Sequence, residues 1–521
     1  MLNTIFNQKI LNLLIAIIIA IFTTGYLRVH FITFFPEPDG GFYTYFAQEI
    51  YAALSNGQNI SSDMPLSLYP LITSWIFSFE INQYIALRWI DLLLAVVASV
   101  LFYKIILKES GSTIFTIIMA GSALLVMNDK DIILYGFRNS IWVSYVPLFG
   151  ALLIWQSISK ADSYKFYLIG GLVALGILFR EPFLLFIILG GVSIFIGYGW
   201  NSFFKYLVGS ALVGAITLGS VFFFREGNLL DLINTYFILT SEVNMIELSF
   251  IDVGLLIVDA FWFLVVISML SIFYAIKSYR HNKNLININR FFFWAALALI
   301  TLLEPLLKMP APYHFANCIP GLVGLSAVGW SSLSLNQSDK TKKYSILIII
   351  LISIYGIYPN LSASLNSKHF KDSKASAHYA YNALWTDIYS SQEQIKWSAY
   401  LLIADVIKRS SNKDSTLAVM IHSLALYPIT GLRPPVFKLY ALDRLYWTKL
   451  DRDESKFIDI LKKYQPTIIT TIMYKFPAGP EPQGLKETIV AIEKTNLYEK
   501  IFTVTAPNVL MGGVYRLKDF K

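Results

Sequence analysis

The chain is dominated by apolar runs that are long enough to cross a membrane. A transmembrane helix needs roughly 17 to 25 apolar residues to cross about 30 Å of hydrocarbon. We identify about eleven such runs, several of them short, at residues 10–33, 83–107, 113–127, 141–158, 166–179, 182–200, 206–224, 254–276, 290–307, 313–333 and 343–358. The sequence therefore predicts a polytopic α-helical membrane protein.

Composition and charge agree with this fold class. The 521 residues are 55% hydrophobic and only 15% charged, too few polar groups to cover the surface of a soluble protein. The formal net charge is +8, but Lys and Arg stand in short clusters between the apolar runs, so no nucleic-acid partner is predicted. The single cysteine, Cys318, excludes an internal disulfide.

The positions of Lys and Arg also predict the orientation. If the amino terminus is cytoplasmic, every inside loop carries positive charge, for example at Lys104, Lys160, Lys205, Lys277 and Lys340. The outside loops are instead rich in carboxylates and aromatic residues. An odd number of spans then puts the carboxy terminus outside. The first run has no small-residue cleavage site, so we interpret it as an anchor.

The sequence changes character near residue 360, which predicts two domains, 1–360 and 361–521. The second part lacks long apolar runs and alternates helix and strand patterns. It predicts helices at 393–409, 454–464 and 485–494, strands at 416–421 and 467–472, and a terminal strand pair. This alternation indicates an extracytoplasmic α/β domain.

The longest outside loop of the membrane part spans residues 35–80. Residues 39–54 place apolar and aromatic side chains at helical spacing. Residues 65–79 form a short apolar and aromatic run with no cytoplasmic charge cluster after it. Both segments are typical of interfacial helices that lie on the membrane surface rather than cross it.

The stretch FPEPDGGFY opens this loop and holds the first catalytic candidate, Asp39. The preceding proline and the following glycines are typical of a helix N-cap at Asp39. The carboxylate is either a cap alone or also a general base that an acceptor hydroxyl reaches. Glu37 is a substrate-binding candidate. If it shares the pocket with Asp39, the pKa of one of the two carboxyls is raised, since two nearby carboxylates resist joint ionisation. Glu49 and Asp63 are weaker candidates.

A second group of candidates stands at the predicted outer ends of spans. It consists of Arg138, Arg180, Glu181 and Lys308. Topology does not favour positive charge there, and ionisable groups at membrane level are costly and usually functional. Arg and Lys side chains that converge suit a phosphate or pyrophosphate. The alternatives are contact with lipid headgroups and an ion pair of Arg180 with Glu181.

Tyr313 and His314 stand at the mouth of the tenth predicted span. His314 is either a base or phosphate partner, or a hydrogen-bonded packing residue. The other histidines show no metal-ligand spacing, and no Walker loop, dinucleotide fingerprint or HExxH occurs. No cofactor and no preformed metal site are predicted, although Asp39, Asp129 and Asp131 leave weak divalent-cation binding open.

Four segments carry a family resemblance, which covers roughly residues 10–335 and, more faintly, the tail. In their order and spacing they resemble the integral-membrane glycosyltransferases of the C-type fold. That family uses polyprenyl-phosphate-linked sugars and includes the bacterial protein mannosyltransferases and aminoarabinose transferases. The segments are PDGGFYTYFAQEIYAALSNGQNI, INQYIALRWIDLLLAVVASVLFYKIIL, GLVALGILFREPFLL and KMPAPYHFANCIPGLVGLSA.

The resemblance implies an inverting hexosyl- or pentosyltransferase in which Asp39 is the general base. Lys308 and Tyr313 fall on the motif that flanks the departing lipid phosphate, and Arg180 falls on a basic turn residue of the family.

The chain departs from the family at three places. Many relatives carry Asp-Glu where this chain has Asp39 followed by Gly40, a lysine where it has the LYP of residues 68–70, and an acidic residue where it has Asn139 or Ser140. The resemblance therefore implies the base more strongly than the phosphate contacts.

The implied partners are a polyprenyl-phosphate sugar donor, a glycan, lipid or protein acceptor, and the lipid bilayer. The implied location is the outer face of a bacterial inner membrane.

Two other functions stay open at this stage. The first is an O-antigen ligase or polymerase, or a lipid-linked oligosaccharide flippase. A ligase is expected to concentrate its basic residues in one late loop, whereas here they are spread. The second is a transporter, which would place ionisable groups near mid-span, for which Asp91 and Asp259 are the candidates.

Overall fold

A computed structural model of the chain divides into two compact units. The first comprises Met1–Ile32, Arg88–Gly219 and Met245–Lys371, and the second comprises Thr33–Leu87, Ser220–Asn244 and Asp372–Lys521. The structure describes residues 2–29, 32, 38–61, 64, 68–128, 139–158, 164–180, 183–228, 230–231, 250–281, 288–307, 316–336, 339–366, 391–420, 423–436, 442, 454–474, 485–506 and 510–520.

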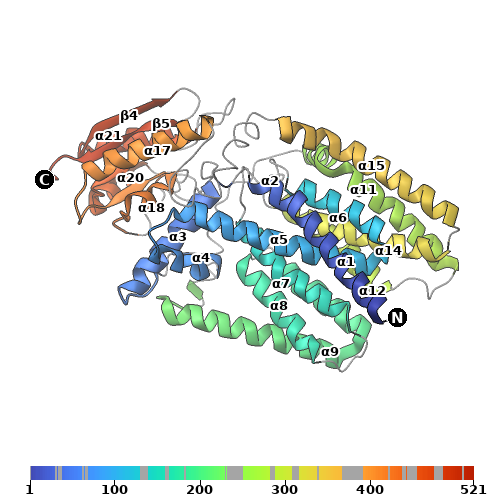
Figure 1. Cartoon of the computed structure of the whole chain (residues 1–521). Helices are drawn as coiled ribbons and strands as arrows, with labels where there is room; N and C mark the ends of the chain where they lie inside the picture. The colour runs from blue at the N-terminus through green and yellow to red at the C-terminus, as the bar shows by residue number, and fades with distance from the viewer. Residues whose placement is uncertain are drawn as a thin grey trace. The chain divides into compact units, whose positions relative to one another are not determined.

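The first unit is built from helices that follow the predicted apolar runs (Figure 1). They are α1 (Leu2–Ala20), η1 (Ile21–Gly25), α2 (Tyr26–Val29), α5 (Gln83–Ser110), α6 (Thr113–Met127), α7 (Asn139–Trp155), α8 (Lys165–Phe179), α9 (Leu184–Phe224), α11 (Phe250–His281), α12 (Ile288–Leu307), η5 (Ala316–Cys318), α14 (Ile319–Asn336) and α15 (Asp339–Asn366). The predicted positions of the helices are therefore confirmed, with ends that differ by a few residues.

The runs predicted at 182–200 and 206–224 form one helical element, α9, that is interrupted at Gly199. Gly199 has φ 81°, a left-handed value that glycine adopts without steric cost. The break thus comes from one backbone position, and no polar loop is needed between the two halves.

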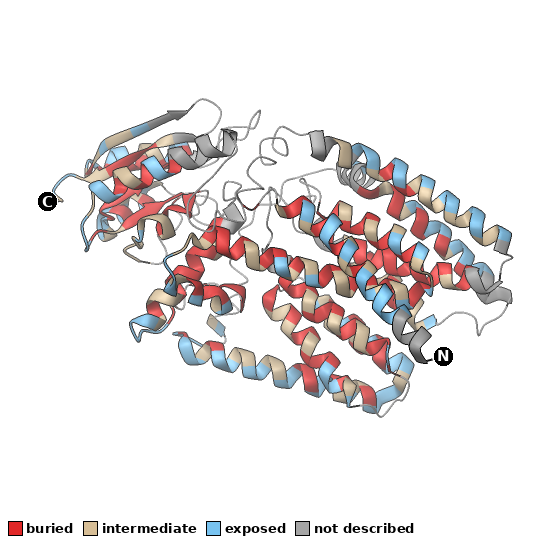
Figure 2. Ribbon diagram, in the orientation of Figure 1, coloured by how far each residue is buried: buried red, intermediate tan, exposed pale blue. Residues whose placement is uncertain are grey.

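Several helices have the length and apolarity that a membrane requires. Four described helices qualify as full spans, at Gln8–Val29, Gln83–Ser110, Leu184–Phe224 and Lys340–Pro359, and shorter apolar helices accompany them. The helices α9 and α15 are largely uncovered by protein (Figure 2), with exposed side chains such as Trp200, Ile216 and Tyr355. These apolar faces are what lipid contact demands. The predicted number of eleven spans stays a prediction.

Close helix packing in the first unit depends on small residues. Gly170 of α8 lies against the backbone of α9, where a Cβ at this position would clash with the Tyr206 carbonyl oxygen. Ser210 of α9 donates a hydrogen bond to the Gly170 carbonyl oxygen at 3.0 Å. Small residues of this kind let helix backbones approach, which gives packing energy that lipid cannot supply.

Replacing Gly170 with alanine should therefore force α8 and α9 apart. We expect a loss of about 2 kcal/mol or more, seen as a lower unfolding midpoint of the purified protein in detergent. Gly214→Ala on α9 is the matched control, because a Cβ there would meet open space in the part of the chain that the structure describes. Equal midpoints for the two variants would contradict the packing role of Gly170.

The second unit combines the loop segment after the first helices, predicted to lie outside, and residues 220–244 with the carboxy-terminal segment that carries the β-sheet. Its elements are α3 (Pro38–Ser55), α4 (Leu68–Thr73), η2 (Ser74–Ser78), α17 (Ser391–Arg409), β1 (Leu417–Val419), α18 (Leu426–Thr430), α20 (Glu454–Tyr464), β2 (Ile468–Thr470), β3 (Met473–Tyr474), α21 (Leu485–Thr495), β4 (Tyr498–Ala506) and β5 (Leu510–Leu517). The helices and strands predicted in both segments are thus confirmed in position.

The strands form a mixed five-stranded sheet of order β1-β2-β5-β3, in which β4 also pairs with β5. β1 and β2 are parallel, whereas β5 is antiparallel to β2, β3 and β4. Amphipathic helices cover the sheet: α20 buries Phe457 and Leu461, which are four residues apart on one face. These side chains join Ile469 and Tyr515 of the sheet in one hydrophobic core.

The contact pattern groups the first outside loop with the carboxy-terminal segment, although more than 300 residues separate them in sequence. The predicted division at residue 360 falls inside α15, whose residues belong to the first unit up to its end at Asn366. The assignment of 1–360 and 361–521 as separate domains stays a prediction.

Candidate functional site

The helix α3 carries the catalytic candidate at its amino-terminal end. It begins at Pro38, so Asp39 is its second residue rather than the N-cap that the sequence suggested. The shift has a simple cause: proline has no N–H to satisfy and its fixed φ suits the first helical position. A carboxylate in the first turn also interacts favourably with the helix dipole. Asp39 thus stands at the start of an 18-residue helix.

The rest of α3 packs against α18 and the chain around it. Gly41 lies so close that a Cβ there would be 3.4 Å from the backbone nitrogen of Ala425. One turn further, the rings of Tyr45 and Tyr427 stack with centroids 4.5 Å apart. Burial raises the pKa of both phenols well above the usual value, so both rings are neutral. The helix α3, whose second residue is Asp39, is therefore fixed along one face.

An ion pair between a buried carboxylate and a partly exposed guanidinium completes this contact. The Arg433 guanidinium donates from Nε to both Glu49 carboxylate oxygens at 2.9 Å and from a second nitrogen as well, a bidentate arrangement. Glu49 is 5% exposed. Burial raises the pKa of the Glu49 carboxyl, while the hydrogen bonds and charge of Arg433 act in the opposite direction. Arg433 therefore compensates a carboxylate that burial would otherwise neutralise.

A polar pocket of about 360 Å³ lies beside this ion pair. Its walls include described residues between positions 59 and 64, Glu226 and the turn after Arg433. The lining residues are Glu49, Ala53, Gln58, Asn59, Ile60, Ser61, Met64, Glu226, Arg433, Pro434, Pro435 and Val436. The sequence indicated Glu49 only as a weaker candidate and gave Arg433 no role, because no local pattern links residues that are 384 positions apart.

The second helical segment of the outside loop, α4 with η2, presents an apolar face. Ile72, Trp75 and Phe79 are 44%, 53% and 51% exposed. The rings of Trp75 and Phe79, the residue that follows η2, lie edge to face with their centroids 5.7 Å apart. Exposed large apolar side chains including tryptophan fit the predicted position at the membrane surface.

Most of the other predicted site residues lie outside the described part of the chain. These are Glu37, Arg138, Glu181, Lys308, Tyr313 and His314. Arg180 is described: it ends α8 in an extended conformation and is 8% exposed. Its backbone N–H bonds the Ile177 carbonyl at 2.9 Å, which closes the last helical turn. Whether the predicted cations converge on one ligand stays a prediction.

A second ion pair lies in the first unit. Arg28 of α2 pairs with Asp91 of α5, and both side chains are fully buried. Arg88 donates to the Ile32 carbonyl oxygen at 2.8 Å, and Arg28 lies over the ring of Trp142. Arg28 was not among the residues singled out from the sequence, although an arginine within an apolar run is itself a signal. Asp91, one of the two candidates for a transporter, is paired with Arg28 in the bundle. The side chain of Asp259, the other candidate, lies outside the described part of the chain.

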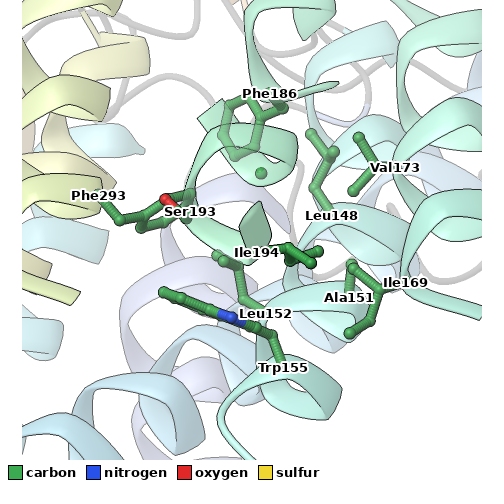
Figure 3. A pocket seen from close by; sticks show the side chains of 11 residues that line it. Leu148, Ala151, Leu152, Trp155, Ile169, Val173, Phe186, Ser193, Ile194 and Phe293 are labelled. Atoms are coloured by element: carbon green, nitrogen blue, oxygen red, sulfur yellow. The ribbon is translucent and has the colours of Figure 1, made fainter. Parts of the chain in front are cut away.

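The first unit also contains a small apolar cavity between α7, α8, α9 and α12 (Figure 3). Side chains such as Leu148, Trp155, Phe186 and Phe293 surround a space of about 20 Å³. That volume holds about one water molecule, and its apolar lining disfavours even that. The cavity is a packing gap and is too small for a lipid chain.

The described residues contain no group of three or more His, Cys, Asp or Glu side chains that would hold a metal ion. Asp129 and Asp131 are not among the described residues. Weak binding of a divalent cation by the carboxylates of the predicted outside loops therefore stays open.

Comparison with solved structures identifies the fold. ArnT from Cupriavidus metallidurans bound to undecaprenyl phosphate aligns over 97% of this chain and 98% of its own, with a TM-score of 0.54 and 13% identity. The archaeal oligosaccharyltransferase AglB from Archaeoglobus fulgidus, in complex with an inhibitory peptide and a dolichol-phosphate, aligns over 97% of this chain and 74% of its own, with a TM-score of 0.50 and 12% identity. No protein-family model and no curated protein sequence matches the chain.

These alignments cover nearly the whole chain, so they include both the helical bundle and the carboxy-terminal segment. The chain is a polytopic membrane protein with the fold of the C-type-fold glycosyltransferases. The resemblance predicted from the sequence is confirmed at the level of the fold, since identities of 12% and 13% show no more than that.

Proposed function

We propose that this protein is a membrane glycosyltransferase that moves a sugar from a polyprenyl-phosphate donor to an acceptor hydroxyl. The observation that carries this proposal is the full-length fold match to a protein bound to undecaprenyl phosphate. It is supported by Asp39, a carboxylate in the first turn of a helix that the second unit fixes along one face. A shared fold alone does not define an activity, so the proposal needs this residue as well.

The proposed reaction is a single inverting displacement. Asp39 takes the proton of the acceptor hydroxyl as its oxygen attacks the anomeric carbon of the donor sugar. The bond from that carbon to the phosphate oxygen breaks, and its electron pair leaves with the polyprenyl phosphate. A glycosidic bond replaces a phosphate ester of the sugar, with no oxidant, reductant or nucleotide.

Negative charge grows on the phosphate as it leaves, so cations in fixed positions should stabilise the transition state. Arg180, Arg138 and Lys308 are the residues proposed for this task, with Tyr313 and His314 nearby in sequence. Glu37 and Glu181 are proposed to orient the acceptor or these cations. No metal ion is required by this scheme.

We further propose that the reaction takes place on the outer face of a bacterial inner membrane. The clusters of Lys and Arg in alternate loops support this orientation, in which the amino terminus is cytoplasmic and the sheet domain is outside. A carboxy-terminal fusion to a reporter that functions only outside the cytoplasm would test it, and a reporter that works only inside would contradict it.

The proposal is tested with purified protein in nanodiscs. Each candidate sugar is offered in two forms, linked to undecaprenyl phosphate and linked to a nucleotide, together with a membrane acceptor fraction. We expect radiolabel to reach the acceptor from the lipid-linked form alone. Transfer from the nucleotide form alone, or from neither form of any sugar, would contradict the proposal.

A further inference from the structure

The pocket beside Glu49 and Arg433 has the features of a small-molecule binding site. Its volume of about 360 Å³ falls in the range of small-molecule sites, roughly 300 to 1,000 Å³. All of its described lining residues belong to the second unit, so the described part of the pocket lies within one compact body.

The pocket walls are held by backbone hydrogen bonds. At the end of α3, Gly57 has φ 63°, its N–H bonds the Leu54 carbonyl, and the Gln58 N–H bonds the Ala53 carbonyl at 2.9 Å. This is the Schellman arrangement, which fixes the turn that leads to Asn59. On the other side, Ile60 and Glu226 are joined by a backbone hydrogen bond of 2.9 Å. The amide and carboxylate side chains at the rim therefore stand on a fixed backbone.

The lining has the chemistry that recognises a polyhydroxylated ring. Gln58, Asn59 and Ser61 offer both donors and acceptors, which is what a ring of hydroxyl groups requires. Met64 and the consecutive Pro434 and Pro435 supply apolar surface for the faces of such a ring.

The charges of the described lining residues disfavour phosphates and acidic sugars. Two carboxylates, Glu49 and Glu226, line the pocket against one guanidinium, Arg433, and that guanidinium is already bound to Glu49. Among the described lining residues negative charge is thus in excess, and it repels anionic ligands. A neutral or amino-bearing ligand is favoured.

We infer that this pocket binds a neutral or amino-bearing sugar ring of a glycan acceptor, at a distance from the hydroxyl that reacts. Glu49 lies ten residues after Asp39 on the same helix, which corresponds to about 15 Å along its axis. The bound ring is therefore a neighbouring unit of the acceptor rather than the one that is deprotonated. This inference rests on the proposed function in naming an acceptor, and it makes the pocket a determinant of acceptor specificity.

The binding test uses the full-length protein in nanodiscs and saturation-transfer NMR with three probes: maltose, glucosamine and glucose 6-phosphate. We expect signal from maltose and glucosamine, and affinity for glucose 6-phosphate at least about tenfold weaker. Asn59→Trp should abolish the signal by filling the pocket, whereas Asn56→Trp, at an exposed position outside the lining, should not. The inference is overturned if neither neutral nor amino sugar binds, or if both tryptophan variants behave alike.

A second variant keeps the inference testable if Asn59→Trp does not fold. Glu226→Gln removes one exposed carboxylate and should reduce the discrimination against glucose 6-phosphate by at least about threefold. Glu80→Gln, an exposed carboxylate that does not line the pocket, should leave it unchanged. Equal discrimination in wild type and Glu226→Gln would contradict the electrostatic part of the inference.

Steady-state kinetics of sugar transfer test whether the pocket takes part in binding the acceptor. With a glycan acceptor, Asn59→Trp should raise the acceptor KM about tenfold or more while kcat and the donor KM stay within about twofold, the pattern of lost uniform binding. An unchanged acceptor KM would overturn the inference while the proposed function stands. Absence of transfer by the wild type would instead overturn the proposed function, and the NMR result would still decide whether the pocket binds sugars.

Discussion

Replacing Asp39 with asparagine should slow sugar transfer by at least about 100-fold, because a positioned general base contributes roughly 100- to 10,000-fold. Asparagine has the same shape but cannot accept the proton of the acceptor hydroxyl. The loss should fall on kcat, since the proton moves in the transition state and binding of both substrates is largely unchanged. Initial rates with the lipid-phosphate donor that serves the wild type would measure it.

The fold of the Asp39→Asn variant should be nearly unaffected. Loss of one charge from the first turn of α3 costs about 0.5 kcal/mol through the helix dipole. Glu80→Gln, at an exposed carboxylate in the same unit, is the control for a general loss of negative charge and should transfer sugar at the wild-type rate. If Asp39→Asn kept more than about a tenth of the wild-type rate, Asp39 would not be the base.

The membrane helices could be predicted from the sequence because their signal is local. The length of an apolar run can be read directly from the sequence. The glycine at position 199 alone accounts for the break in α9. The helices and strands of the tail followed from periodicity in the same way. Asp39 shifted by two positions relative to the helix start, from the N-cap to the second helical residue, which is within the usual uncertainty of a helix end.

The surroundings of the site could not be predicted, because they depend on contacts that no local pattern encodes. Glu49 appeared as one carboxylate on a helix, and Arg433 as part of a proline-rich loop, and only the fold brings them together across 384 residues. The same is true of the stacking of Tyr45 on Tyr427. Arg28 is a different case: the sequence holds its signal, but the partner Asp91 is visible only in the folded bundle.

Replacing Arg433 with alanine should destabilise the second unit in a way that depends on pH. Removing one member of a fully buried ion pair costs about 3 to 5 kcal/mol. Because the Arg433 side chain is 42% exposed, solvent screens the pair and we expect about 2 kcal/mol near pH 8. The expected readout is a lower midpoint of thermal unfolding of the purified protein at fixed detergent concentration.

The direction of the pH dependence follows from Glu49. Burial raises the pKa of this carboxyl, and Arg433 provides the interactions that lower it, so the variant should have a pKa that is higher still. An acid whose pKa is higher in the folded state favours folding below its unfolded pKa, and that contribution is lost as the pH rises through the folded pKa. The difference between variant and wild type should therefore be smallest near pH 5 and grow toward pH 8.

Two further variants separate this mechanism from a general loss of charge. Arg409→Ala breaks an exposed pair with Asp405 on α17, at 2.8 Å, and should lower the midpoint little at any pH. Glu49→Gln combined with Arg433→Ala removes the titrating group, so its difference from wild type should no longer grow as steeply with pH as that of Arg433→Ala. A midpoint shift in Arg433→Ala that was the same at pH 5 and pH 8 would show that the buried carboxylate is not what Arg433 stabilises. Since the same ion pair joins Arg433 to α3, the helix whose second residue is Asp39, a pH-dependent shift would assign this part of the stability to the helix that carries the proposed base.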